Sequence, residues 1–396
     1  MTDKRPTHLT LFLTALKLGC TSFGGPIAHL AYFHDEYVTR RGWTDEESYA
    51  DLVALCQFLP GPASSQVGFG VGLKQRGLVG GLLCWVGFTL PSALLMIGFG
   101  YGVSALGGLA QAGWVHGLNV AAVAVVAQAV ILMGRRLCPD LTRATMAGLA
   151  GVLLLFFTAG WVQLTVLLGG GLAGWSWLQQ ETVAANPDNL PPSRTRRMAF
   201  VWLLLFLVPL LLLPLQARLS GHPAWLVAGK FYEAGALVFG GGHVILPLLQ
   251  DAMVTPGWLS PDCFLAGYGA AQALPGPLLT FAASVGTVIS VGPGGWVGGV
   301  WALAWVFAPA LLIVLAVLPW WNRLRAHAGA QAALRGANAA VVGLLAAALI
   351  NPIGVTAITG MKQAVLALVA FGCLHLPRVP VWAVVAGCAL LGQLFL

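Results

Sequence analysis

Charged side chains are too scarce in this sequence to cover the surface of a water-soluble protein. Only 8% of the 396 residues are Lys, Arg, Asp or Glu, whereas an ordinary soluble domain contains about 25%. A further 58% are hydrophobic. This composition excludes a soluble globular enzyme, a disordered chain and a nucleic-acid-binding module, and the glycines show no collagen period. It indicates an all-α, polytopic membrane protein.

Apolar segments of membrane-spanning length recur along the whole chain. At about 20 apolar residues per crossing, we expect about 13 transmembrane helices, arranged as six, one linking helix and six. Lys4 and Arg5 precede the first segment without a convincing cleavage site, so we expect a retained span rather than a signal peptide. The expected spans lie near 9–32, 49–72, 78–103, 114–133, 144–160, 162–178, 199–216, 225–250, 263–289, 296–321, 336–350, 355–376 and 379–396.

These segments divide the chain into three regions. An N-terminal repeat covers 1–178, a polar cytoplasmic linker with one extra transmembrane helix covers 179–224, and a C-terminal repeat covers 225–396. With the N-terminus in the cytoplasm, fourteen of the 20 Lys and Arg residues fall inside and four outside, in agreement with the positive-inside rule. This bias explains the net charge of +7 without a nucleic-acid partner.

The two halves of the sequence resemble each other at an offset of 215 to 219 residues. Phe23-Gly-Gly-Pro26 returns as Phe239-Gly-Gly-Gly242, and Gly42–Pro62 aligns without gaps on Gly257–Pro277, with seven identities in 21 positions. Basic residues follow the Leu-Pro-Gly-Pro segment in the first half, whereas in the second half they follow the next segment. This exchange predicts two inverted-topology repeats, which are typical of secondary transporters.

Phe-Gly-Gly and Leu-Pro-Gly-Pro motifs interrupt apolar segments where a continuous helix would otherwise form. Proline removes a backbone donor and glycine loosens the helix, so each motif should expose N–H groups at the start of a half-helix. Such a start can bind a small anion; a packing kink between small residues is the alternative. The candidate substrate-binding residues are Ser22, Gly24, Gly25, Gln57, Gly61, Ser64, Ser65, Gly241, Gly242, His243, Gln272, Gly276 and Thr280, and the helix-breaking prolines are Pro26, Pro60, Pro62, Pro275 and Pro277.

Lys17 and Glu233 are charged residues inside expected spans, and they share one repeat position. Because charges within spans are usually functional, Lys17 is a further candidate anion ligand and Glu233 a candidate proton carrier. The alternatives are an ion pair between the two halves or snorkelling to the membrane surface. His29 is a second candidate for proton coupling, because imidazole titrates near neutral pH; a hydrogen-bonded packing role is its alternative.

Motifs for enzymatic or ATP-driven chemistry are absent from the sequence. It contains no Walker A, G-x-S-x-G or H-E-x-x-H pattern. The seven cysteines form no C-x-x-C pair and no zinc-type spacing with histidine. We therefore expect buried free thiols, no metal, no cofactor and no enzymatic activity.

Four stretches carry a resemblance to a known family. Ser22–Leu30 and Tyr49–Gln66 in the first half, and Phe239–Val244 and Gly267–Pro277 in the second, are similar to the paired signatures of the chromate ion transporter family in its long two-domain form. The resemblance covers essentially the whole chain. It implies a protein of the bacterial inner membrane that exports chromate and confers resistance, with sulfate as a related anion. It also implies important positions at Ser22, Gly24, Gly25, Pro26, His29, Pro60, Gly61, Pro62, Gly241, Gly242 and Pro275 to Pro277.

The combined hypothesis is an α-helical carrier that binds a divalent oxyanion between two inverted domains and moves it by alternating access. The proton gradient or counter-transport would drive it, and its partners would be the chromate or sulfate anion, the lipid bilayer and, as an open alternative, a second copy in a homodimer. An oxyanion channel and a sulfate-type uptake carrier are the rival functions. Re-entrant hairpins at the Leu-Pro-Gly-Pro segments are the rival topology.

Overall fold

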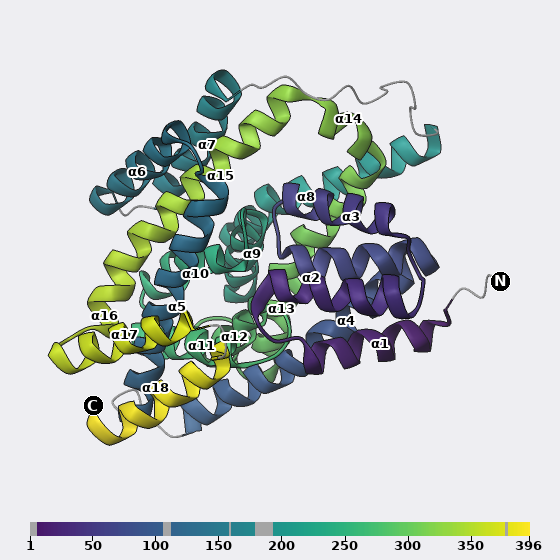
Figure 1. Cartoon of the computed structure of the whole chain (residues 1–396). Coiled ribbons are helices and arrows are strands. Elements are labelled where there is room, and N and C mark those ends of the chain that lie inside the picture. The colour runs from purple at the N-terminus through teal and green to yellow at the C-terminus, as the bar shows by residue number, and fades with distance from the viewer. Residues whose placement is uncertain (1–5, 106–111, 158–159, 179–192, 377–378) are drawn as a thin grey trace.

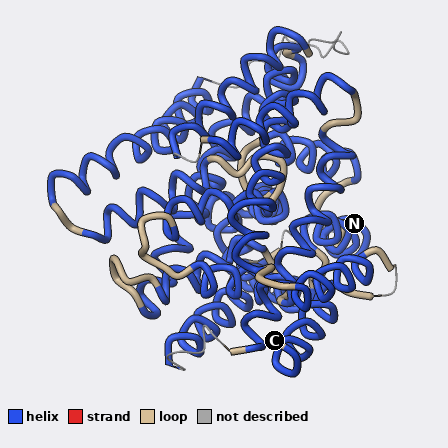
Figure 2. Tube along the Cα trace, turned by 90° about the vertical axis from the view of Figure 1, so that its left-hand side faces the viewer, coloured by secondary structure: helices blue, strands red, loops and turns tan. Residues whose placement is uncertain are grey.

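The computed structural model describes residues 6–105, 112–157, 160–178, 193–376 and 379–396. Helices joined by short turns account for these residues, and no strand occurs among them (Figure 2). The expected linker at 179–192 and the turn at 106–111 lie outside the described residues. Five helices are long and apolar enough to cross a membrane: Ala63–Ser104, Gly113–Leu137, Arg196–Ser220, Gly295–Ala326 and Ala328–Ala357. The chain is a helical membrane protein.

In its described residues, the first half of the chain forms seven α-helices and one π-helical turn; Figure 1 shows how the helices are arranged. A kink at Arg76 and Gly77, which have non-helical dihedral angles, divides α4 into a short and a long part. The elements are α1 (His8–Thr21), α2 (Gly25–Phe33), the π-helical η1 (His34–Arg40), α3 (Glu46–Phe58), α4 (Ala63–Ala105), α5 (Gly113–Leu137), α6 (Leu141–Phe156) and α7 (Gly160–Trp177).

The second half follows α8 (Ser193–Ser220) and has a similar succession of elements. A second π-helical turn, η4, lies where η1 lies in the first half. The elements are α9 (Pro223–Ala236), η3 (Gly242–Val244), α10 (Ile245–Leu249), η4 (Gln250–Val254), α11 (Pro261–Ala273), η5 (Leu278–Thr280), α12 (Phe281–Val288), α13 (Gly295–Val317), η6 (Leu318–Trp320), α14 (Trp321–Ala326), α15 (Ala328–Ala348), η7 (Leu349–Gly354), α16 (Val355–Ala357), α17 (Met361–Leu374) and α18 (Val381–Phe395).

Two expected spans of the first half are each built of two helices that fold back on each other. The side chain of Arg76 donates to the carbonyl of Pro6 at 2.8 Å, so the end of the short part of α4 lies beside the start of α1. Lys74 donates to the carbonyl of Ser48 at 3.4 Å, close to the start of α3. The segments 9–32 and 49–72 are therefore helical hairpins whose tips are the Gly-Gly and Pro-Gly-Pro motifs.

The second half contains the corresponding hairpins. The backbone and side chain of Ser290, just after α12, both donate to the carbonyl of Trp258, just before α11, at 3.1 and 2.9 Å. Gly292 lies against Val227 near the start of α9. The expected spans 225–250 and 263–289 are likewise each broken into helices that fold back on each other, which at 263–289 is the arrangement of the re-entrant alternative. Glycine and proline interrupt the helix at each tip, so the chain can reverse there. Hydrogen bonds between open ends, such as those of Lys74 and Ser290, then hold the paired helices side by side.

Small residues bring the long helices close together. A Cβ atom on Gly117 of α5 would lie 2.1 Å from the carbonyl oxygen of Cys388 on α18, and one on Gly336 of α15 would lie 2.1 Å from that of Gly170 on α7. Contacts this close are how apolar helices associate in lipid, where no hydrophobic drive holds them. The two contacts occupy equivalent places in the two halves, and they fix α5 and α15 beside the hairpins.

Candidate functional site

The four hairpin tips meet where the two halves of the chain contact each other. The amide of Gly61, in the second tip of the first half, donates to the carbonyl of Val238, in the first tip of the second half, at 2.6 Å. In return, the amide of Gly276 donates to the carbonyl of Ser22 at 3.0 Å. Each half thus supplies the hydrogen-bond donor that the other half's broken helix lacks.

The backbone at Gly61 requires glycine. Its φ of +126° is rarely adopted by residues with a side chain, and a Cβ atom would lie 2.7 Å from both the Cβ of Ala310 and the Nε2 of Gln66. The Gln66 amide also donates to the carbonyls of Pro60 and Ala310, at 2.8 and 3.1 Å. Gln66 therefore ties this tip to α13 of the other half.

A cavity of about 210 Å³ opens beside the Gly61 tip. It lies between α2, α3, α5 and the first tip of the second half, with one contribution from α15. Apolar side chains make most of its wall. The groups able to bind a polar ligand are Gln57, Gly61, Arg136, Gly240, Gly241, His243 and Asn338.

Arg136 is the only charged residue among the described side chains that line this cavity. It lies in the last turn of α5, and its guanidinium donates to the Oε1 atom of Gln57 at 2.5 Å. One bond leaves further N–H donors of the guanidinium free to bind a ligand. A cavity with one arginine and no carboxylate selects for anions, and the planar guanidinium suits an oxyanion.

Two further side chains give the cavity polar walls. The Nδ1 atom of His243 lies 2.7 Å from the hydroxyl of Tyr268, which fixes the ring. The Oδ1 atom of Asn338 is buried without a hydrogen-bond partner among the described residues. Gly240 and Gly241 have φ values of +75° and +143° and precede η3, so their backbone lies open at a helix start. These groups would orient a small polar ligand held by Arg136.

The first tip of the first half forms a buried polar cluster near the cavity. His29 is 2% exposed; its Nδ1 atom lies 3.3 Å from the Ser64 hydroxyl, and its ring meets Phe88 edge-on. The hydroxyls of Ser22 and Ser65 are buried without partners in the described part of the chain. His29 is thus hydrogen-bonded and packed, which is the arrangement expected if it has a packing role rather than a proton-coupling role. It lies on α2, the helix whose Pro26 and Leu30 line the cavity, but does not line the cavity itself.

The structure distributes the sequence-derived candidates over all four tips. Of these candidates, Pro26, Gln57, Gly61, Gly241 and His243 line the cavity. The side chain of Thr280 bonds its own turn at the carbonyl of Pro277, at 2.8 Å, and the Nε2 atom of Gln272 is buried without a partner in the residues described. Gly24, Gly25, Pro60, Pro62, Gly242, Pro275 and Gly276 lie in or beside the turns between half-helices.

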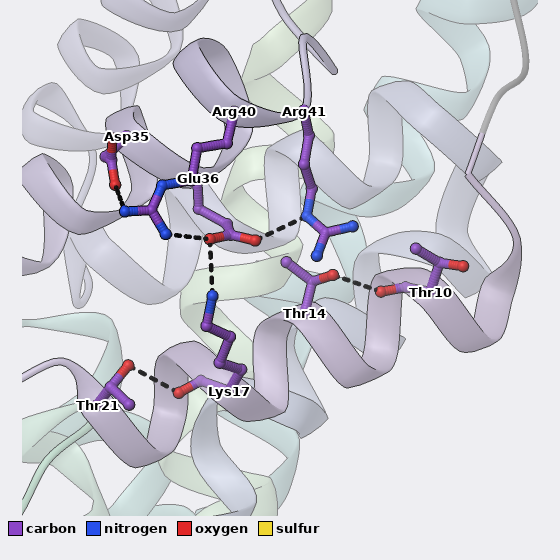
Figure 3. Close-up of polar contacts among 8 residues, drawn as sticks. All are labelled: Thr10, Thr14, Lys17, Thr21, Asp35, Glu36, Arg40 and Arg41. Atoms are coloured by element: carbon purple, nitrogen blue, oxygen red, sulfur yellow. Dashed lines mark hydrogen bonds and ion pairs between the residues drawn. The ribbon is translucent and has the colours of Figure 1, made fainter.

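Lys17 faces a carboxylate instead of the cavity (Figure 3). Its Nζ atom lies 3.1 Å from Glu36, which also binds Arg41 at 2.8 Å and Arg40 at 3.7 Å. Burial alone would raise the pKa of Glu36, but the hydrogen bonds from Arg41 and Lys17 outweigh it and hold the pKa below its ordinary value. Lys17 thus has a carboxylate partner and does not line the cavity, so its assignment as an anion ligand stays a prediction without support from this geometry.

Glu233 does not pair with Lys17, so the alternative of an ion pair between the halves is corrected as well. Its carboxylate lies 3.5 Å from Lys230, one turn earlier on α9. Both residues line a second, separate cavity together with Asp251. Glu233 therefore has a local partner on its own helix.

Arg136 is the residue that sequence reasoning missed. It lies at the end of an apolar segment, next to Arg135, where a basic pair is explained by membrane orientation alone. The sequence marks Asn338 through a further repeat match, in which Gly117-x-Asn119 returns as Gly336-x-Asn338. A buried amide in an apolar helix was the available signal for the site.

Comparison with known proteins gives a consistent result over both halves. A family model described as chromate transporter matches residues 9–175 and again residues 225–393. A chromate transport protein of Pseudomonas aeruginosa is 29% identical over 88% of this chain and 81% of its own length. One of Cupriavidus metallidurans is 28% identical over 96% and 92%, and a probable chromate transport protein of Synechococcus elongatus is 27% identical over 85% and 82%. No solved structure shows a significant match.

Proposed function

This chain belongs to the chromate transporter family, and on that premise we propose that it exports chromate from the cytoplasm across the bacterial inner membrane. The observation that carries the proposal is the cavity beside the Gly61 tip, whose only described charge is Arg136. Chromate is a tetrahedral dianion with four acceptor oxygens. The guanidinium of Arg136 and the amide N–H groups of Gln57 and Asn338 would donate hydrogen bonds to those acceptors.

The location of the cavity between the halves supports a carrier mechanism. Gly61, Gly240 and Gly241 come from tips of different halves, so a relative movement of the halves would open and close the cavity. The paired bonds of Gly61 and Gly276 give that movement two equivalent contact points. We infer alternating access by the two halves around the anion.

Hairpin folding strengthens the proposed inversion of the halves. With 9–32 and 49–72 returning to their starting side, Arg40 and Arg41 join Lys74 and Arg76 on the cytoplasmic side in our proposal. The long helices that follow then run in opposite directions in the two halves. Basic residues concentrate more strongly inside than a scheme of about 13 crossings would give.

The membrane potential itself favours export. A dianion leaving a negative interior gains about 4.6 kcal/mol per 100 mV, twice the value for a single charge. We propose that this term, together with proton or other counter-transport, drives the cycle. Sulfate has the same charge and shape and is the expected competing substrate.

Uptake of labelled chromate and sulfate into inside-out vesicles tests the proposal, with the proton gradient and the potential collapsed in parallel runs. Vesicles with the wild-type chain should accumulate unreduced chromate. At chromate concentrations below KM, Arg136→Ala should slow accumulation about tenfold or more, while the variant of its equally exposed neighbour, Arg135→Ala, keeps the wild-type rate. If no anion accumulates above empty-vector vesicles, the transport function is wrong. If Arg136→Ala transports normally, the cavity is not the binding site.

A further inference from the structure

A third cavity, with polar lining, lies between the π-helical turns η4 and η7, away from the anion cavity; it shares Gln163 and Asp251 with the cavity at Lys230 and Glu233. It has a volume of about 210 Å³, and its polar lining consists of Gln163, Gln250, Asp251, Thr255 and Asn351. Asn338 of α15 lines the anion cavity and Asn351 of η7 lines this one. The two residues are 13 positions apart in the chain, which corresponds to about 20 Å along a helix. The two cavities share no lining residue.

Gln250 is the strongest sign that this cavity holds a ligand. The residue is only 3% exposed, and neither its Oε1 nor its Nε2 atom has a hydrogen-bond partner among the described residues. A buried amide with both ends unpaired is costly and rare in native structures. Gln250 lines the cavity, so a ligand bound there would lie next to this unpaired residue.

Asp251 gives the cavity a charge that the surrounding protein does not neutralise. The charged groups that face it are Lys230 and Glu233 of α9, and these two pair with each other at 3.5 Å. Within the described chain, Asp251 itself makes no ion pair within 4 Å. The three groups together carry one net negative charge, so one positive charge is missing.

The equivalent turn in the first half shows what a compensated arrangement looks like. Asp35, which aligns with Asp251, pairs with Arg40 at 2.9 Å, and the adjacent Glu36 binds Lys17, Arg40 and Arg41. In the second half, the stretch between Asp251 and Gly257, which corresponds to the stretch holding Arg40 and Arg41, contains no Lys or Arg. The π-helical turn η4 therefore has an aspartate, Asp251, but no arginine nearby in the sequence to pair with it.

We propose that the cavity between η4 and η7 binds a monovalent metal cation of the Na⁺ type. The donors are oxygens, which hard cations prefer: the Asp251 carboxylate, the amide oxygens of Gln250, Gln163 and Asn351, and the Thr255 hydroxyl. One carboxylate balances one positive charge, whereas protein sites for divalent cations usually gather several carboxylates. This inference concerns cation binding alone and stands whether or not the transported anion is chromate.

Thermal unfolding of the purified full-length protein in detergent tests the inference, at pH 8, without chromate or sulfate. Choline chloride is replaced stepwise by NaCl or KCl at constant ionic strength. The wild-type midpoint should rise saturably, by about 2 °C when the salt reaches about tenfold its dissociation constant. Asp251→Asn should abolish the rise, and the equivalent first-half variant Asp35→Asn should keep it.

Two milder variants keep the test decisive if Asp251→Asn does not fold. Thr255→Val and Gln163→Leu each remove one oxygen donor and should raise the half-saturating salt concentration several-fold. Equal midpoints in NaCl, KCl and choline chloride would mean that the cavity holds water only, and would overturn the proposal. A full salt response in Asp251→Asn would overturn it as well.

Discussion

The Gly61 amide hydrogen-bonds to the carbonyl of Val238 across the boundary between the two halves of the chain, at 2.6 Å. The residues aligned with this pair, Gly276 and Ser22, make the same bond in the opposite sense at 3.0 Å. Two broken helices therefore complete each other's backbone hydrogen bonding. The halves cannot reach this arrangement separately, so folding of the tips and association of the halves are coupled.

Replacing Gly61 by alanine should damage both the fold and the anion cavity. The new Cβ would lie 2.7 Å from Ala310 and Gln66 at a φ of +126°, so the tip must shift and weaken the bond to Val238. We expect a loss of about 2–4 kcal/mol in unfolding free energy, from backbone strain and overpacking together. Chromate efflux from cells and unfolding of the purified protein in denaturant measure the two effects.

Gly98→Ala is the matched control for this prediction. Gly98 lies inside α4 with ordinary helical geometry, and a Cβ atom there would meet nothing within 4 Å. Its replacement should leave transport and stability close to wild type. Wild-type transport by Gly61→Ala at equal membrane abundance would contradict the role given to this tip.

Arg136 should determine anion affinity. Arg136→Ala removes the only charge among the described cavity residues, together with the bond to Gln57. A charge-assisted hydrogen bond contributes about 1.5–3 kcal/mol, so we expect KM for chromate to rise about tenfold or more. Arg136→Lys keeps the positive charge but lacks the planar set of donors, so its KM for chromate should lie between the values for wild type and Arg136→Ala. An unchanged KM in Arg136→Ala would place the anion elsewhere.

Local features of the fold could be read from the sequence, whereas long-range contacts could not. Glycine and proline at 24–26 and 60–62 indicate where helices stop, because their backbone chemistry acts within one turn. Whether the chain then continues across the membrane or returns depends on bonds such as Lys74 to Ser48, 26 residues apart. An apolar run has the same composition in both cases.

The residues of the candidate site show the same difference between local features and long-range contacts. Gln57, Gly61, Gly241 and His243 were found because they lie in or next to the repeated motifs. Arg136 reaches the cavity from a different helix, 79 residues beyond Gln57, and no local pattern links the two. The partner of Lys17 could not be predicted for the same reason, because Glu36 lies 19 residues away on the returning arm of the hairpin.

Glu36 should make the first hairpin sensitive to acid. Its carboxylate is buried and binds Lys17, Arg40 and Arg41, and its pKa lies below the ordinary value of 4.5. A lowered folded-state pKa means that the stabilisation is complete above the ordinary value and is lost as the pH falls through the lowered one. Glu36→Gln should therefore cost about 1–3 kcal/mol at neutral pH and show a shallower loss of stability below about pH 5.

Unfolding midpoints measured from neutral to acidic pH check this prediction. Asp35→Asn is the control, because Asp35 is exposed and its pair with Arg40 should contribute less than about 1 kcal/mol. Identical pH profiles for wild type and Glu36→Gln would show that the cluster does not stabilise the hairpin.

Hairpin folding places residues before α3 and residues after the short part of α4 on one side of the membrane. We expect cysteines at Thr39 and Lys74 to share that side, because Lys74 contacts Ser48 at 3.4 Å, and a cysteine at Arg218, at the end of α8, to lie on the other. In a variant lacking the native cysteines, a membrane-impermeant thiol reagent applied to intact spheroplasts should label Arg218→Cys alone. Thr39→Cys and Lys74→Cys should react only after permeabilisation. Labelling of Thr39→Cys in intact spheroplasts, with Lys74→Cys protected, would instead mean that 49–72 crosses the membrane and that the hairpin does not exist in the bilayer.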